Sequence, residues 1–67
     1  MNYPITIVER IIGHRRQANT EWPVVRKVQK CGARRWIVVD VCNGIAEQTG
    51  PTFRRLADAR ARFKEAA

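Results

Sequence analysis

Hydrophobic and polar residues alternate along much of this chain, and the alternation predicts β-strands. A first strand is predicted over residues 4–12, which are rich in β-branched side chains and end at Gly13. A second is predicted over 22–30 and a third over 35–42. The intervening segment 14–21 is polar, so it is expected to form an exposed loop.

The pattern changes after the third strand. Asn43 and Gly44 form a turn signal, and residues 45–48 allow a short fourth strand before Gly50 and Pro51 interrupt the chain. Whether this fourth segment joins the sheet is left open by the sequence.

Helix formers dominate from Arg54 or Arg55 to the C-terminus. Thr52 is a candidate cap, and Asp58 and Arg62 have the i,i+4 spacing of an ion pair. One helical stripe carries the apolar residues Leu56, Ala59, Phe63, Ala66 and Ala67. The sequence therefore predicts an α+β fold, β-β-β-α, in which one C-terminal helix packs on one face of a three- or four-stranded antiparallel sheet.

The register between the second and third strands has two alternatives, and the register decides which side chains share a face. The favoured one has a two-residue type II′ turn with Gly32 at its first central position. Its core face holds Trp22, Val24, Val28, Ile37, Val39 and Val41, and its outer face holds Val25, Lys27, Gln29, Arg34, Trp36, Val38 and Asp40. A three-residue turn would shift the pairing by one residue, place Arg26 opposite Asp40, and exchange the faces of Trp36 and Ile37.

Length and composition describe a single small basic domain over residues 1–67. A chain of this size buries only about 60% of its unfolded surface, so its stability is marginal and an enclosed active site has no room. No apolar run is long enough to span a membrane, and the N-terminus lacks the features of a secretory signal. The expected location is the cytoplasm of a bacterial or phage-infected host cell.

Residues that carry chemistry are sparse. Cys31 and Cys42 lack metal-ligand spacing and are expected near opposite ends of one hairpin, too far apart for a disulfide. His14 is the only histidine, and the carboxylates show no clustered spacing. The sequence therefore predicts no enzyme, no cofactor and no metal site.

The charge gives the clearest functional signal, because 13 Lys and Arg residues against 6 Asp and Glu residues leave a net charge of +7. Much of the excess is arginine in three doublets, Arg15-Arg16, Arg34-Arg35 and Arg54-Arg55, and each lies where one predicted element gives way to the next. A surface potential of this size attracts polyanions, of which nucleic acid is the commonest. The residues expected to contact the partner are Arg15, Arg16, Lys27, Gln29, Lys30, Arg34, Arg35, Trp36, Arg54 and Arg55. If the three doublets lie together they form a binding surface, and if they scatter they serve solubility.

The segment Trp36-Ile37-Val38-Val39-Asp40, followed by Thr52-Phe53-Arg54-Arg55-Leu56-Ala57-Asp58-Ala59, resembles the arm-binding N-terminal domains of phage-type tyrosine recombinases. Those domains, like plant AP2 domains, lay a three-stranded sheet in the major groove of DNA. The resemblance covers about the last 45 residues. It implies that Lys27, Gln29, Arg34 and Trp36 face bases or phosphates, and that Lys30 and Arg35 act as clamps. The long first loop, the extra strand and the lack of a recombinase body depart from that family.

A second hypothesis belongs to another class. Phage-encoded inhibitors such as anti-CRISPR proteins are also small, cysteine-poor domains with a charged surface. Here the cationic surface would dock on an acidic host protein rather than on nucleic acid. A homodimer through the edge of the first strand is compatible with both hypotheses.

Overall fold

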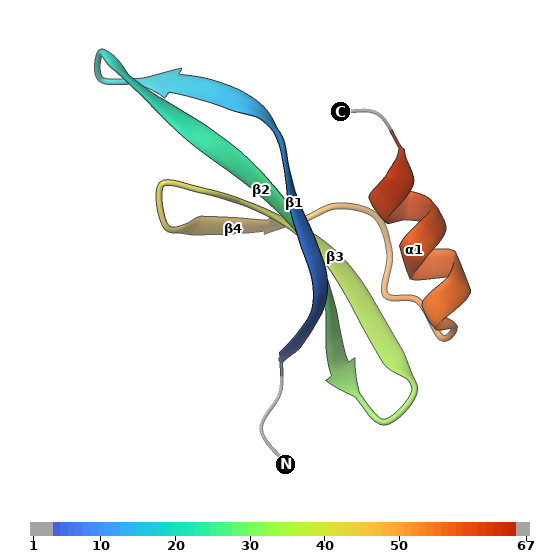
Figure 1. Cartoon of the computed structure of the whole chain (residues 1–67). Helices are drawn as coiled ribbons and strands as arrows, with labels where there is room; N and C mark the ends of the chain where they lie inside the picture. The colour runs from blue at the N-terminus through green and yellow to red at the C-terminus, as the bar shows by residue number, and fades with distance from the viewer. Residues whose placement is uncertain (1–3, 66–67) are drawn as a thin grey trace.

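A computed structural model describes residues 4–65 and shows a four-stranded antiparallel sheet with one C-terminal helix (Figure 1). The strands follow one another in the order β1-β2-β3-β4. The elements are β1 (Ile5–Gln17), β2 (Thr20–Gly32), β3 (Arg35–Cys42), β4 (Ile45–Gln48) and α1 (Leu56–Lys64). The predicted α+β architecture is confirmed, and the fourth strand that the sequence left open belongs to the sheet.

Helix α1 covers one face of the sheet and forms the core there. Val28 and Val38 are fully buried against Ala59 and Phe63 of the helix. Val8, Trp36, Phe53 and Leu56 surround this cluster and are partly buried. The predicted apolar stripe is confirmed for Leu56, Ala59 and Phe63, while Ala66 and Ala67 lie outside the described residues. Within residues 4–65, no helix has the length and apolar character needed to cross a bilayer.

The favoured hairpin register was wrong, and the alternative pairing is the one observed. Arg26 lies opposite Asp40, and Lys30 lies opposite Trp36. The turn residues are Ala33 and Arg34, and the pairing is irregular between Lys30 and Gly32. This extra residue in β2 produces the same one-residue shift as a three-residue turn. The even-numbered residues of β2 and β3 therefore face the helix.

The predicted loop over 14–21 was also wrong, because β1 and β2 continue through it as a two-stranded arm. Ala18 and Asn19 form the turn, with φ angles of 48° and 65°. Positive φ at both central residues is the type I′ geometry that suits the twist of a hairpin. Strand β3 does not reach this part of β2, so both faces of the arm meet water and polar residues occupy both.

Local predictions around the helix had mixed outcomes. Residue Arg55 precedes the helix, and no side chain caps its start, so the Thr52 cap is not formed. The Arg62 guanidinium contacts Glu65 at 2.9 Å rather than Asp58. The Asn43–Gly44 turn is confirmed, with positive φ at both residues. Cys31 and Cys42 are free thiols, as predicted.

Candidate nucleic-acid interface

Two of the three arginine doublets meet at one end of the sheet. The backbone N–H of Trp36 donates to the Phe53 carbonyl at 2.8 Å, and the N–H of Phe53 donates to the Trp36 carbonyl at 2.7 Å. This bridge fixes the segment before α1 against the start of β3. Arg54 and Arg55 directly follow Phe53, so they lie near Arg35 at the β2–β3 turn.

Five basic residues form what we call the basic end: Lys30, Arg34, Arg35, Arg54 and Arg55. The four arginines are exposed, and the Lys30 Nζ atom lies 5.7 Å from the centroid of the Trp36 ring. A cation over an indole ring is held there by the ring's negative face. Across segments 30–36 and 53–58, Asp58 is the single acidic residue. This end of the molecule is therefore strongly positive.

The ion pairs of the described chain lie elsewhere. Within residues 4–65 they join Arg26 to Asp40 at 2.8 Å, Lys27 to Glu9 at 3.4 Å and Arg62 to Glu65 at 2.9 Å. Half of the six acidic residues thus neutralise cations outside the basic end. The excess charge stays on side chains that are free to meet an anion.

The third doublet lies apart from the basic end. Arg15 and Arg16 are in the arm, opposite Trp22 and Glu21. Gly32, at the other turn, lies eleven residue steps along β2 from Glu21, which is roughly 36 Å at about 3.3 Å per residue. The molecule is 40 Å in its longest dimension, so the two groups occupy opposite ends.

The predicted outer face that Lys27, Gln29 and Trp36 were to share does not exist. Lys27 and Gln29 lie on the face away from the helix, where Lys27 pairs with Glu9 and Gln29 donates to the Thr6 hydroxyl at 3.4 Å. Trp36 lies on the opposite face, packed against the core below the helix. The one-residue shift in register is the cause, since it moves every side chain of β3 to the other face relative to β2.

Two arginines that the sequence did not single out hold the helix in place. Arg26 is only 7% exposed. It donates to both carboxylate oxygens of Asp40, at 2.8 and 3.0 Å, and to the Glu65 carbonyl at 3.0 Å. Arg10 donates to the Phe63 carbonyl at 2.8 Å, with its guanidinium 5.0 Å from the Phe63 ring centroid. Cations placed here satisfy the last carbonyls of α1 and complement its dipole.

The hydrogen bond that Arg26 donates to the Asp40 carboxylate raises the pKa of Arg26 above its ordinary value, while burial acts in the opposite direction. Arg26 therefore stays charged inside the fold, and its role is structural. The signal that reveals it in the sequence is the alternative register, which places Arg26 opposite Asp40.

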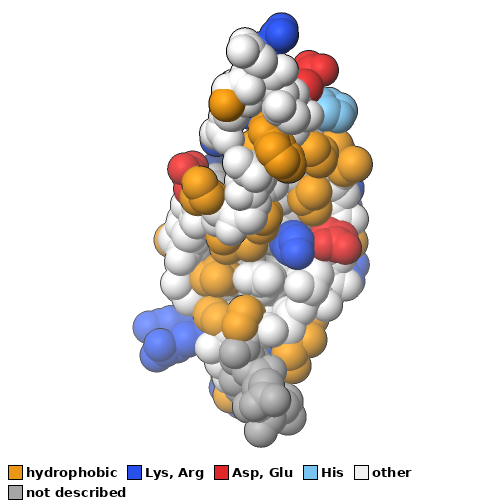
Figure 2. Space-filling view, turned by 90° about the vertical axis from the view of Figure 1, so that its left-hand side faces the viewer, with side chains coloured by type: hydrophobic (Ala, Val, Ile, Leu, Met, Phe, Trp, Pro, Cys, Tyr) orange, Lys and Arg blue, Asp and Glu red, His pale blue; other side chains and the backbone are white. Residues whose placement is uncertain are grey.

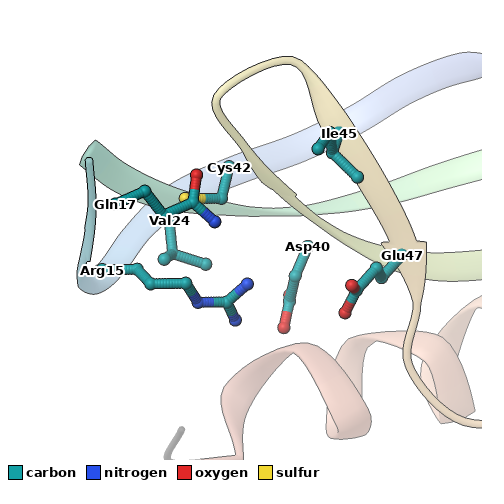
Figure 3. Close-up of a pocket in the computed structure, with 7 residues that line it drawn as sticks. All are labelled: Arg15, Gln17, Val24, Asp40, Cys42, Ile45 and Glu47. Atoms are coloured by element: carbon teal, nitrogen blue, oxygen red, sulfur yellow. The ribbon is translucent and has the colours of Figure 1, made fainter.

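A small hollow lies on the helix side of the sheet, between the arm and β4 (Figure 3). It is lined by Arg15, Gln17, Val24, Asp40, Cys42, Ile45 and Glu47, and Figure 3 shows the Arg15 guanidinium pointing toward Asp40. Its volume of about 50 Å³ holds a water molecule or two, whereas ligand pockets measure roughly 300–1,000 Å³. A larger, open hollow of about 350 Å³ adjoins it beside Ile12, Gly13 and His14. In the part of the chain that the structure describes, no three His, Cys, Asp or Glu residues gather as metal ligands.

Comparison of the chain with protein-family models, with curated proteins and with solved structures found no match. The functional inference therefore rests on the geometry and charge of the molecule.

Proposed function

We propose that this protein binds nucleic acid, with duplex DNA as its ligand, through the basic end. The observation that supports the proposal is the gathering of Lys30, Arg34 and Arg35 with Arg54 and Arg55 from a distant part of the chain. Among residues 4–65 these cations have no ion-pair partner, so they repel one another and the arrangement costs stability. Binding to phosphates relieves that cost.

The exposed face of the sheet is a poorer candidate for the DNA contact. In the arm-binding domains that the chain resembles, this face enters the major groove. Here its centre carries Val25, Val39 and Val41, and its lysine is paired with Glu9. We therefore place the β2–β3 turn, with Arg34 and Arg35, at the groove, and assign Arg54 and Arg55 to the flanking phosphates.

Phosphate binding through five side chains has a quantitative signature. Each neutralised phosphate of B-DNA contributes a slope near −0.9 to a plot of log K against log salt concentration. Five contacts predict a slope of about −4.5, which is a loss of roughly 500-fold in affinity between about 50 and 200 mM salt.

The experiment measures binding to a fluorescent duplex of random sequence by anisotropy at several salt concentrations. Two variants with the same change in charge are compared, Arg54→Gln/Arg55→Gln at the basic end and Arg15→Gln/Arg16→Gln in the arm. We expect the first variant to make the slope less negative by about 1.8. The second variant should leave the slope unchanged.

Two results would contradict the proposal. One is no binding of the wild-type protein to duplex at low salt, which would favour docking of the basic end on an acidic host protein, as an inhibitor does. The other is an equal loss in both variants, which would show that net charge alone attracts DNA and that the basic end has no special role.

A further inference from the structure

The face of the sheet opposite α1 is apolar across its full width. Directly paired residues form a row over all four strands, consisting of Ile11, Val25, Val41 and Ala46. Ile37 and Val39 continue the apolar residues along β3; Ile11 is 60% exposed, Ile37 is half-buried and Val39 is buried among its neighbours. Figure 2 shows hydrophobic side chains spread over this side of the molecule. We call these six residues the open face.

Strand β3 has the composition of a strand that is covered on both sides. From Trp36 to Val41, Asp40 is the only polar residue. Sheets with one solvated face normally alternate apolar and polar residues, whereas near-continuous apolar runs are typical of strands buried on both faces. Helix α1 covers the side of Val38, whereas no helix or strand of residues 4–65 packs on the side of Val39 and Val41, although neighbouring side chains leave Val39 only 6% exposed.

The open face also differs from the rest of the surface in its charge. The charged residues that lie among these six side chains on the same side of the sheet are Glu9 and Lys27, which pair at 3.4 Å and sum to zero. A basic and an acidic side chain adjoin among the apolar residues in Figure 2. On a chain with a net charge of +7, this is a neutral region, so neither a polyanion nor an acidic partner gains there.

We propose that a second copy of this chain packs on the open face, forming a two-sheet sandwich with the helices outside. A two-fold interface brings the same patch together with itself, so the patch must be complementary to itself. An apolar surface that surrounds one positive and one negative side chain meets that condition, because Lys27 of one copy can face Glu9 of the other. This interface uses the face of the sheet, not the edge of β1.

The positive charge of each copy does not prevent this association. Gly32 lies seven residue steps along β2 from Val25, which places the basic end roughly 23 Å from the row that crosses all four strands at about 3.3 Å per residue. The Debye length is about 8 Å at physiological ionic strength, so the repulsion between copies is largely screened.

The area indicates a weak dimer. Four strands spaced by about 4.8 Å and about seven residues long present roughly 450 Å² per copy. The pair then buries about 900 Å², near the lower limit for a specific interface, and the expected dissociation constant is micromolar. The basic end stays outside the interface, so the inference does not depend on DNA binding.

Sedimentation equilibrium of the full chain over a range of concentrations tests the proposal. Ile11→Lys places a charge in the open face, and Ile45→Lys is its matched control. Both residues are 60% exposed, but Ile45 lies on the other face of the sheet. We expect dimerisation of the wild type, a loss of at least tenfold in dimer affinity for Ile11→Lys, and less than a twofold change for Ile45→Lys.

A charge swap shows whether the occupant is a second copy. Lys27→Glu sets two acidic residues side by side in each face and is expected to weaken the dimer about tenfold. Adding Glu9→Lys restores one charge of each sign in both copies, so it is expected to restore dimerisation. Unchanged thermal unfolding of the dilute variants confirms that they fold.

Three outcomes would overturn the proposal. A wild-type chain that stays monomeric at concentrations on the order of 500 μM has no such interface. Equal weakening by Ile11→Lys and Ile45→Lys places the contact elsewhere. Failure of the charge swap to restore the dimer contradicts the reciprocal pairing.

Discussion

At the scale of single residues, arginine has two separate roles in this protein. Arg10 and Arg26 donate hydrogen bonds to carbonyls at the end of α1, and Arg26 does so from inside the fold. Arg34 and Arg54 have the same side chain, but they are exposed and lie at the basic end. Net charge therefore overstates the cations available to a partner, because the count includes those that hold the structure.

Replacing Arg26 tests its structural role. Arg26→Met leaves the partly buried Asp40 carboxylate without its partner and removes the bond to the Glu65 carbonyl. We expect a loss of about 2–4 kcal/mol in the free energy of unfolding, measured with urea, since breaking a buried pair costs about 3–5 kcal/mol and Asp40 keeps some contact with water.

The control is Arg62→Met, which breaks the more exposed pair with Glu65 and should cost less than about 0.5 kcal/mol. Similar losses in the two variants would show that the Arg26 site has no special importance.

The two tryptophans allow a comparable test of the core. Trp36 packs against the cluster under α1, whereas Trp22 lies in the arm opposite Arg15. We expect Trp36→Ala to cost about 2–4 kcal/mol and Trp22→Ala about 1 kcal/mol, because only the first leaves a gap in the core. Thermal unfolding followed by circular dichroism measures both. A well-folded Trp36→Ala protein with unchanged stability would contradict the observed register.

At the scale of elements, the sequence predicted correctly those segments in which the turn residues and the burial of apolar side chains indicate the same structure. The bounds of β3 and β4 match the predicted segments 35–42 and 45–48, and Asn43 and Gly44 form the turn between them. The arm was missed because its turn contains Ala18, which rarely adopts a positive φ. Its strands also lack apolar alternation, since neither of their faces is covered along the arm.

The turn of the arm is therefore strained, and relieving the strain should stabilise it. Ala18→Gly removes the cost of a positive φ at alanine, with an expected gain of about 0.5 kcal/mol after the larger entropy of unfolded glycine is subtracted. Ala33→Gly is the control, because Ala33 is also a turn residue but has no positive φ. It should lose about 0.5–1 kcal/mol. Thermal unfolding and amide exchange in the arm measure both, and effects of the same sign would argue against the type I′ turn.

At the scale of the whole molecule, the distribution of charge matters more than its sum. Two unit charges about 8 Å apart repel by roughly 0.5 kcal/mol in water. Five cations near one another thus destabilise the basic end, while the doublet in the arm is too distant to add to this repulsion. Such a cost is expected of a surface that binds an anion.

Salt should therefore stabilise the free protein. Raising sodium chloride from about 10 to 100 mM shortens the Debye length from roughly 30 to 10 Å, and we expect the melting temperature to rise by about 2–6 °C. Arg54→Gln/Arg55→Gln should melt higher than the wild type at low salt and respond less to added salt. Arg15→Gln/Arg16→Gln should respond as the wild type does. Identical responses of all three proteins would contradict a concentrated repulsion at the basic end.

The sequence by itself determined the kinds of elements, their order and the bounds of β3 and β4, because these follow from local periodicity, turn residues and helix propensity. It also determined the surplus of positive charge. Tertiary structure decided which side chains share a face. A shift of one residue exchanges the faces of a strand, and β3 is apolar on both, so hydrophobicity does not select a register there. The pairing of Arg26 with Asp40 below the end of α1 accompanies the observed register, and the bridge from Trp36 to Phe53 brings two distant arginine doublets to one end.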